Sequence, residues 1–268
     1  MDYDEYYQEC KKTYVKSNYD VSLYSKPVEI HEVGKFSKQY YETVDSLSKK
    51  IKHDFDKKID CKDDGIMITH NNMWKFQNEF ETICNILVPY LESNKYGCHL
   101  YVDKIYIYRT LKIKNLKSSY KWHYDNNPDE ILKNLIYLND VDEDNSPFEY
   151  LQDMHKEGVT IRATRRGLIN WKRAPNGARI TESQMQAKIK EGCCPKKVVA
   201  PKGTTISFLN NTIHKVNPIT SGYRDVINIR VKPTMKAPPA YVNKNWTTSY
   251  EFPGVVNKDP KISWRSKT

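Results

Sequence analysis

The spacing of the apolar residues changes once along this chain, near residue 95. Before that point, in residues 36–55 and 73–92, large apolar side chains recur every three or four positions, which is the period of a helix with one buried face. After it, residues 99–110 alternate and are rich in Tyr, Ile and Val, which is typical of a strand. Helices followed by many short strands predict an α+β protein, with a β-sandwich or jelly-roll core backed by N-terminal helices.

Shorter patterns complete the expected set of elements. Further strands are expected over residues 119–124, 132–138, 204–209 and 224–231. One more helix is expected to open at Thr181, because Gln184 completes the sequence of a capping box. Residues 1–30 are expected to be extended or loosely packed, and residues 57–72 to form a loop. The buried stripe expected on the second helix consists of Trp74, Phe76, Phe80, Ile83, Leu87 and Leu91.

The chain is expected to form a single domain. No internal repeat or low-complexity linker divides it, and 268 residues are enough to bury one large core. The expected parts are helical support over residues 1–95, a jelly-roll core over 99–232 and a tail over 233–268. Frequent prolines make that tail irregular rather than helical.

The formal net charge of +10 admits a nucleic acid, an anionic membrane surface or an anionic small molecule as partner. The lysines and arginines are scattered, so a solvated basic surface is the preferred interpretation over a dedicated nucleic-acid site. The six cysteines lack zinc-type spacing and indicate free thiols in a reducing compartment. With a polar N-terminus and no apolar run of ~18 residues, we expect a soluble, intracellular, cytoplasmic protein with no membrane partner.

His123 and Asp125 are separated by one residue on an expected strand. Alternate residues of a strand share a face, so both side chains can reach one metal ion. Two histidines and one carboxylate on one side of Fe(II) leave adjacent coordination positions open, which non-haem oxygenases use. A His-x-Asp pair is a weak signal by itself, and a second imidazole must come from elsewhere in the chain.

That imidazole is supplied by His214, which lies between an expected turn at Asn210 and the last expected strand. On this strand the apolar residues Ile227, Ile229 and Val231 share one face, and the other face carries Arg224, Val226, Asn228 and Arg230. An arginine that faces the inside of a barrel needs an anion, because an unpaired buried charge is costly. A carboxylate is the natural partner, since it accepts two hydrogen bonds from a guanidinium.

With these residues the sequence resembles the Fe(II)- and 2-oxoglutarate-dependent dioxygenases, which are built on a double-stranded β-helix. Their pattern is His-x-Asp, a long gap, a histidine, and then an arginine or lysine. Here His123, Asp125 and His214 are followed after ten residues by Arg224. Residues 123–151 are similar to the prolyl-hydroxylase and phytanoyl-type branches of this superfamily.

The resemblance implies roles for particular residues. The implied catalytic and metal-binding residues are His123, Asp125 and His214. It implies that Arg224 pairs with the distal carboxylate of 2-oxoglutarate, and that O2 is the oxidant. Tyr137 matches a cosubstrate-binding tyrosine of the family, with an ordinary core tyrosine as the alternative, and Tyr108 is a further candidate. Val226 departs from several branches, which have serine there, and Asp125 favours hydroxylation over halogenation.

The segment from about residue 151 to 200 falls where the family places substrate-contacting loops. Its basic and aromatic residues include Arg162, Arg165, Arg166, Trp171, Lys172, Arg173 and Arg179. They suit an anionic or aromatic substrate, and the alternative is a set of exposed loop charges. Three functions remain open: an oxygenase that hydroxylates a small molecule or a peptide side chain, an oxygenase that acts on nucleic acid, and a jelly-roll binding protein without catalysis. The complete ligand set argues against the third.

Overall fold

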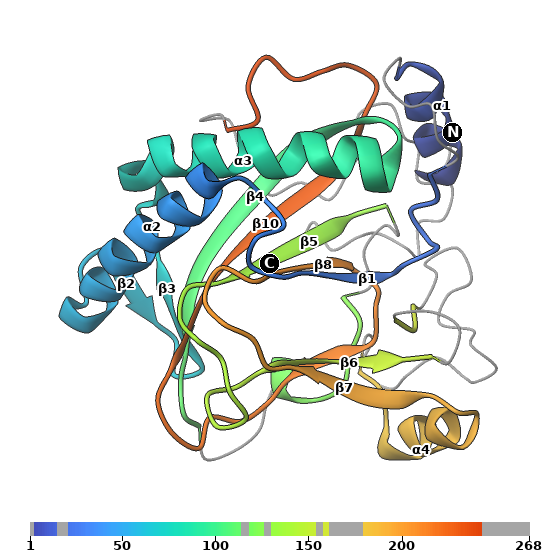
Figure 1. Ribbon diagram of the computed structural model, residues 1–268. Coiled ribbons are helices and arrows are strands. Elements are labelled where there is room, and N and C mark those ends of the chain that lie inside the picture. Colours follow the sequence, from blue (N-terminus) through green and yellow to red (C-terminus); the bar gives the residue numbers. More distant parts are fainter. Residues whose placement is uncertain are drawn as a thin grey trace.

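Two antiparallel sheets lie one above the other in the computed structural model (Figure 1). The structure describes residues 3–14, 21–113, 118–125, 130–153, 158–160 and 179–242. The larger sheet contains, in spatial order, β1 (Val28–His31), β8 (Thr205–Leu209), β5 (Leu132–Tyr137), β10 (Arg224–Thr234), β4 (His99–Thr110), β3 (Met67–His70) and β2 (Cys61–Asp63). The smaller sheet contains β7 (Cys194–Val198), β6 (Phe148–Gln152) and β9 (His214–Val216).

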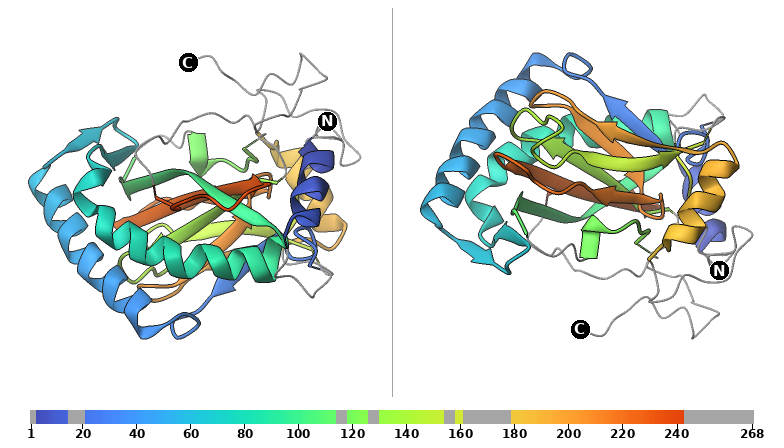
Figure 2. Two further views of the ribbon diagram at one scale, coloured as in Figure 1. Left: turned by 90° about the horizontal axis from the view of Figure 1, so that it is seen from above. Right: turned by 90° about the horizontal axis from the view of Figure 1, so that it is seen from below.

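Two long helices, α2 (Lys38–Lys57) and α3 (Gln77–Leu91), cover the outer face of the larger sheet (Figure 2). The Ser37 side chain caps the start of α2 by accepting a hydrogen bond from the backbone of Tyr40. Both helices were expected from their apolar spacing, and the expected stripe of α3 is buried from Phe76 onward. Trp74 corrects that stripe: it lies on the 3-10 turn Met73–Phe76 before the helix, with 37% of its surface exposed.

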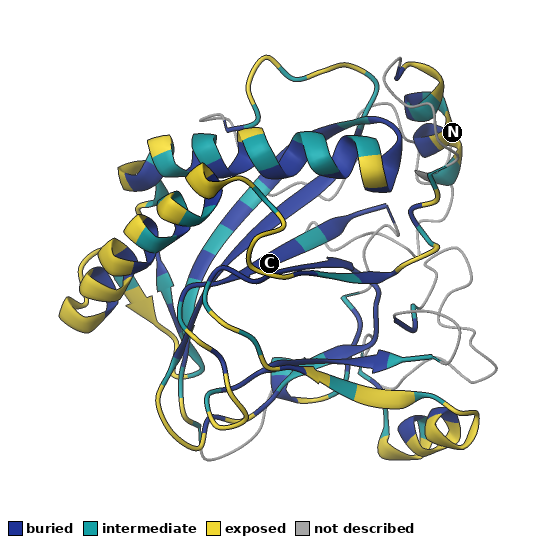
Figure 3. Cartoon of the chain, viewed as in Figure 1, coloured by how far each residue is buried: buried dark blue, intermediate teal, exposed yellow. Residues whose placement is uncertain are grey.

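The strand β10 has different chemistry on its two faces, as the alternation of its sequence predicts. Ile227, Ile229 and Val231 join the core under the helices, whereas Val226 joins a second core between the sheets. That inner core consists of Val28, Leu135, Tyr137, Val141, Phe148, Tyr150, Val198, Ile206, Phe208 and Val226. Both faces are buried along nearly the whole strand (Figure 3), so the polar side chains of the inner face are buried as well.

Two N-terminal expectations are wrong. Residues 1–30, expected to be extended or loosely packed, contain the helix α1 (Tyr3–Lys12). Tyr6 and Tyr7 of this polar segment are buried, and the Tyr7 hydroxyl donates to the Tyr96 carbonyl over 2.7 Å. Residues 57–72, expected to be a loop, form the hairpin of β2 and β3, with Gly65 at positive φ in the turn. Short, polar edge strands such as β2 carry little periodic signal.

The C-terminal half agrees with expectation except around the smaller sheet. The helix α4 (Glu182–Lys190) opens at Thr181 with a complete capping box. The strands β6, β7 and β9 were not expected. Residues 119–124, expected to be a strand, instead contain part of a 3-10 turn, Ser118–Tyr120, and isolated bridges from His123 to Arg179 and to His214. Residues 243–268 of the expected tail lie outside the described residues.

All six cysteines are free. Within the described ranges, the helices are too short or too polar to traverse a lipid bilayer.

Candidate metal centre

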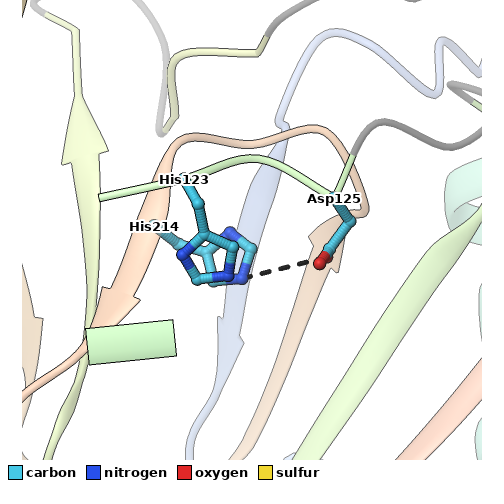
Figure 4. Close-up of side chains that lie close together, drawn as sticks. All are labelled: His123, Asp125 and His214. Atoms are coloured by element: carbon cyan, nitrogen blue, oxygen red, sulfur yellow. Dashed lines mark ion pairs between the residues drawn. The ribbon is translucent and has the colours of Figure 1, made fainter. Parts of the chain in front are cut away.

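His123, Asp125 and His214 converge in the space between the two sheets. Each offers one ligand atom, and these atoms all lie within 4.8 Å of one another. Figure 4 shows the side chains pointing toward a common point, with His214 Nε2 and Asp125 Oδ2 3.9 Å apart. The centroids of the two imidazole rings are 4.2 Å apart. The structure therefore brings together the residues that the sequence assigned to a metal.

Backbone pairing closes the long gap in sequence between the two histidines. The backbone N–H of His123 donates to the carbonyl of His214 over 3.0 Å, and that of His214 donates to the carbonyl of His123 over 2.9 Å. Directly paired residues of an antiparallel ladder project to the same side. The N–H of Asp125 donates to the carbonyl of Asn210 over 3.2 Å, which fixes the carboxylate beside them.

Both imidazoles are held in the form that a metal requires. Nδ1 of His123 donates to the carbonyl of Lys121, and Nδ1 of His214 to that of Thr212, each over 2.8 Å. The proton on Nδ1 leaves the lone pair of Nε2 free to bind a metal. Burial lowers the pKa of His123 to about 3, helped by the neighbouring His214, and burial also lowers the pKa of His214. Both rings are therefore neutral near pH 7.

Asp125 is ionised although only 20% of its side chain is exposed. Burial alone would raise the pKa of its carboxyl, but the charge of Lys133 and the two histidines hold it well below its usual value. The Lys133 ammonium donates to Oδ2 of Asp125 over 2.7 Å. This lysine was not among the site residues predicted from the sequence. Its only signal is its position on β5, two residues before Leu135 on the inward-facing side.

Arg224 is a fully buried cation, with 0% of its surface exposed. Nη1 donates to the Ser146 carbonyl over 2.6 Å, and Nη2 to Oγ1 of Thr110 over 3.0 Å. Nε has no acceptor, and no carboxylate pairs with the guanidinium among the described residues. An arginine without an anion in this position is costly, so a ligand carboxylate would satisfy it.

The two candidate tyrosines lie side by side with Val226, which is paired with Tyr108 on β4 and with Tyr137 on β5. The hydroxyl of Tyr137 donates to the Val198 carbonyl over 2.9 Å and accepts from the N–H of Phe148 over 3.1 Å. Burial raises the pKa of Tyr137 to about 12, so the phenol stays protonated. Their contact with a cosubstrate remains a prediction.

The basic loop is only partly within the described residues. Residues 161–178, with most of its arginines and Trp171, lie outside them. Arg179 is described, and its backbone forms a bridge with His123.

No protein-family model matches the sequence, and no curated protein matches it either. Among solved structures, the epimerase SnoN, in complex with Fe3+, alpha-ketoglutarate and nogalamycin RO, has a TM-score of 0.52 at 10% identity, over 86% of this chain and 84% of SnoN. HygX from Streptomyces hygroscopicus, with nickel, 2-oxoglutarate and hygromycin B bound, has a TM-score of 0.49 at 12% identity, over 80% of this chain and 85% of HygX. EctD from S. alaskensis, with bound Fe, has a TM-score of 0.49 at 13% identity, over 78% of this chain and 73% of EctD. The similarity to SnoN shows a shared fold, and at the level of the fold it confirms the sequence resemblance.

Proposed function

We propose that this protein is a non-haem Fe(II)- and 2-oxoglutarate-dependent dioxygenase. The observation that carries the proposal is the meeting of two neutral imidazoles and an ionised carboxylate with a buried arginine, Arg224, that has no carboxylate partner among the described residues. A metal alone would leave Arg224 unexplained, and a dicarboxylate alone would leave the histidines unexplained. Iron with 2-oxoglutarate uses both. SnoN, which has the same fold, contains Fe3+ and alpha-ketoglutarate in its structure.

The strand order supports a double-stranded β-helix within a single domain. From β4 onward the chain alternates between the sheets. It passes from β4 to the bridge at His123, back to β5, across to β6 and β7, back to β8, across to β9 and back to β10. A jelly roll places its ligand between the two sheets, and this is where the candidate metal ligands lie.

The donor set fits Fe(II). The metal would be held by Nε2 of His123, Nε2 of His214 and a carboxylate oxygen of Asp125, on one side only. When bound, iron and 2-oxoglutarate supply with O2 the oxidising power that breaks a substrate C–H bond. The bonds from each Nδ1 to a carbonyl fix the rings, and Lys133 fixes one oxygen of Asp125, so that the ligands need little rearrangement.

The remaining residues would bind the cosubstrate and exclude water. Arg224 would donate hydrogen bonds to the distal carboxylate of 2-oxoglutarate, with Nε, which lacks an acceptor among the described residues, as one donor. Tyr108 and Tyr137 would line the path between that carboxylate and the metal. The rings of Phe148 and Phe208 lie 5.5 and 5.1 Å from that of His214 and keep this space apolar. Exclusion of water strengthens the ion pair at Arg224.

We propose hydroxylation of a small molecule or a peptide side chain as the reaction, because Asp125 retains the carboxylate ligand. SnoN is an epimerase on the same fold, so the fold alone does not distinguish hydroxylation from other C–H oxidations, and product analysis does. The net charge of +10 favours a nucleic-acid substrate as the second candidate. Steep salt dependence of oligonucleotide binding would support that candidate.

Succinate formation tests the enzyme class against the third alternative, a binding protein. The full chain with Fe(II), 2-oxoglutarate and O2 should form succinate, slowly even without substrate. His123→Ala should abolish it. His31→Ala is the matched control, because His31 is also buried but bonds to Ser207 on the far side of the sheet. Succinate from His123→Ala at the wild-type rate would refute the ligand assignment, and none from the wild type would favour a binding protein.

A further inference from the structure

Three cationic side chains lie in one row on the inner face of the larger sheet, next to the metal centre. Arg230 on β10 is paired in register with Lys133 on β5 and with Lys104 on β4. Register partners on neighbouring antiparallel strands project to the same face, with Cβ atoms roughly 5 Å apart. Like charges directly opposite each other destabilise a sheet, so this row needs a counter-charge.

The protein itself supplies a counter-charge for two of the three. Arg230 donates to both oxygens of Asp103 at 2.6 to 3.0 Å. Lys133 donates to Asp125, which the proposed metal would share. Lys104 is half-buried and forms no ion pair within the described part of the chain. Its ammonium lies over the Tyr106 ring, 4.6 Å from the centroid, and burial together with the charge of Arg230 lowers its pKa.

A fourth cation approaches from the opposite side. Arg179 bridges His123 in the backbone, so its side chain projects to the same side as that ligand. Within the described ranges the Arg179 guanidinium makes no ion pair with a carboxylate.

The charges around the site therefore do not balance. Arg230 is neutralised by Asp103, and Arg224 is assigned to the cosubstrate under the proposed function. Lys133 then pairs with a single carboxylate, Asp125, which a divalent metal would also share, and Arg179 projects to the same side as the ligand His123. The carboxylate that acts on Lys104 is Asp103, which already pairs with Arg230 and lies 3.9 Å from Lys232. The unbalanced positive charge lies between the two sheets, within about two strand spacings, roughly 10 Å, of Asp125.

We propose that Lys104, Lys133 and Arg179 form a recognition site for an anionic group of the substrate, a carboxylate, sulfate or phosphate. This rests on the proposed function, because it places the anion beside the oxidised carbon, and it names the substrate class as a small organic anion. A small molecule fits better than a nucleic acid. The lysines are half-buried on an inner sheet face, whereas a nucleic-acid backbone would need an exposed basic stripe.

Inorganic sulfate is the probe that tests this site, because it carries the charge and binds divalent metals weakly. Sulfate is titrated into the full chain at constant ionic strength by calorimetry, first without metal and then with Mn(II) and 2-oxoglutarate. Lys104→Met keeps the aliphatic stem and removes the charge. Lys62→Met, an exposed lysine on β2 of the same sheet, is the matched control with an equal change in net charge.

Saturable sulfate binding to the wild type is expected, weakened about tenfold or more in Lys104→Met and less than about twofold in Lys62→Met. Bound Mn(II) and 2-oxoglutarate should leave it in place. The proposal is overturned by any of three results: no saturable binding below roughly 10 mM, equal binding by both variants, or displacement of sulfate by 2-oxoglutarate, which would assign the row to the cosubstrate. If an oligonucleotide bound far more tightly than sulfate, and if its binding depended on Lys104, the site would recognise a nucleic acid and not a small organic anion.

The titration also separates this inference from the function on which it rests. Sulfate binding to the metal-free chain needs neither iron nor turnover. If Mn(II) and 2-oxoglutarate bind but sulfate does not, only the anion site is wrong. If sulfate binds in a Lys104-dependent way but no succinate is ever formed, the proposed function is wrong.

Discussion

Two arginines on the inner face of β10, Arg224 and Arg230, are almost completely buried and differ in what surrounds them. Near the middle of the strand, Arg230 forms a two-point ion pair with Asp103. At the start of the strand, Arg224 donates to a backbone carbonyl and to a hydroxyl, and among the described residues its guanidinium has no carboxylate partner and its Nε has no acceptor. The difference indicates that a buried cation with a structural role is paired with a carboxylate of the protein itself, as at Arg230. For Arg224, which lacks such a partner among the described residues, we propose that a ligand supplies the anion.

The largest expected effect is on stability, at Arg230. Arg230→Met should lower the free energy of unfolding by about 3 kcal/mol, because the buried Asp103 loses its hydrogen-bonded partner and keeps only the Lys232 ammonium, 3.9 Å away. The affinity of the folded protein for 2-oxoglutarate should change less than about twofold. Urea unfolding measures the first quantity and calorimetry the second. Adding Asp103→Leu should restore much of the stability. A loss below about 1 kcal/mol in Arg230→Met alone would mean that the Arg230 ion pair does not stabilise the fold and does not differ from Arg224 in this respect.

The opposite pattern is expected at the Arg224 end. Arg224→Met should raise the dissociation constant of 2-oxoglutarate roughly 100-fold, since charge-assisted bonds to a carboxylate contribute about 1.5–3 kcal/mol each. The free energy of unfolding should change by only about 1 kcal/mol, because the substitution also removes the cost of a buried cation. Unchanged cosubstrate affinity together with a large loss of stability would make Arg224 structural.

Stabilisation by a bound metal compares a proposed ligand, His214, with a buried histidine outside the site, His31. Mn(II) at 100 times its dissociation constant should stabilise the wild type by about 2.7 kcal/mol. It should stabilise His31→Ala equally and should fail to stabilise His214→Ala. Thermal unfolding with and without the metal measures this. Equal stabilisation of His214→Ala would mean that the ion binds elsewhere.

The smallest effects distinguish the two tyrosines beside Val226. Tyr137→Phe removes the hydroxyl that bonds to Val198 and Phe148, so it should cost about 1–3 kcal/mol of stability. Tyr108→Phe should raise the dissociation constant of 2-oxoglutarate by about fivefold, the contribution of one neutral hydrogen bond, with little change in stability. If Tyr108→Phe lowered the stability and Tyr137→Phe weakened the binding of 2-oxoglutarate, Tyr137 would be the cosubstrate-binding residue and Tyr108 the structural one.

The elements that could be predicted from the sequence are those with a regular spacing of apolar residues. The alternation of β10 separates its apolar and polar faces because side chains of a strand alternate, so Arg224 could be placed inside without a structure. The long helices α2 and α3 and the strand β4 follow from the same kind of periodicity. His214 was found because it belongs to a pattern with His123 and Arg224.

The missed features depend on contacts that no local pattern contains. Arg230 meets Asp103 because the register of β10 and β4 shifts between Arg230 and Val231. Lys133 meets Asp125 only through the arrangement of two sheets. The helix α1 was missed because its composition is polar, and the burial of Tyr6 and Tyr7 depends on distant partners such as Tyr96.

The most direct test of the central claim is the anaerobic visible spectrum of the protein with Fe(II) and 2-oxoglutarate. We predict a weak charge-transfer band that requires both additions, persists in Arg230→Met, needs much more 2-oxoglutarate in Arg224→Met and is lost in His214→Ala. A wild type that binds Fe(II) without developing the band, or an Arg224→Met variant that develops it at the wild-type concentration of 2-oxoglutarate, would contradict the assignment of His214 to the metal and of Arg224 to the cosubstrate.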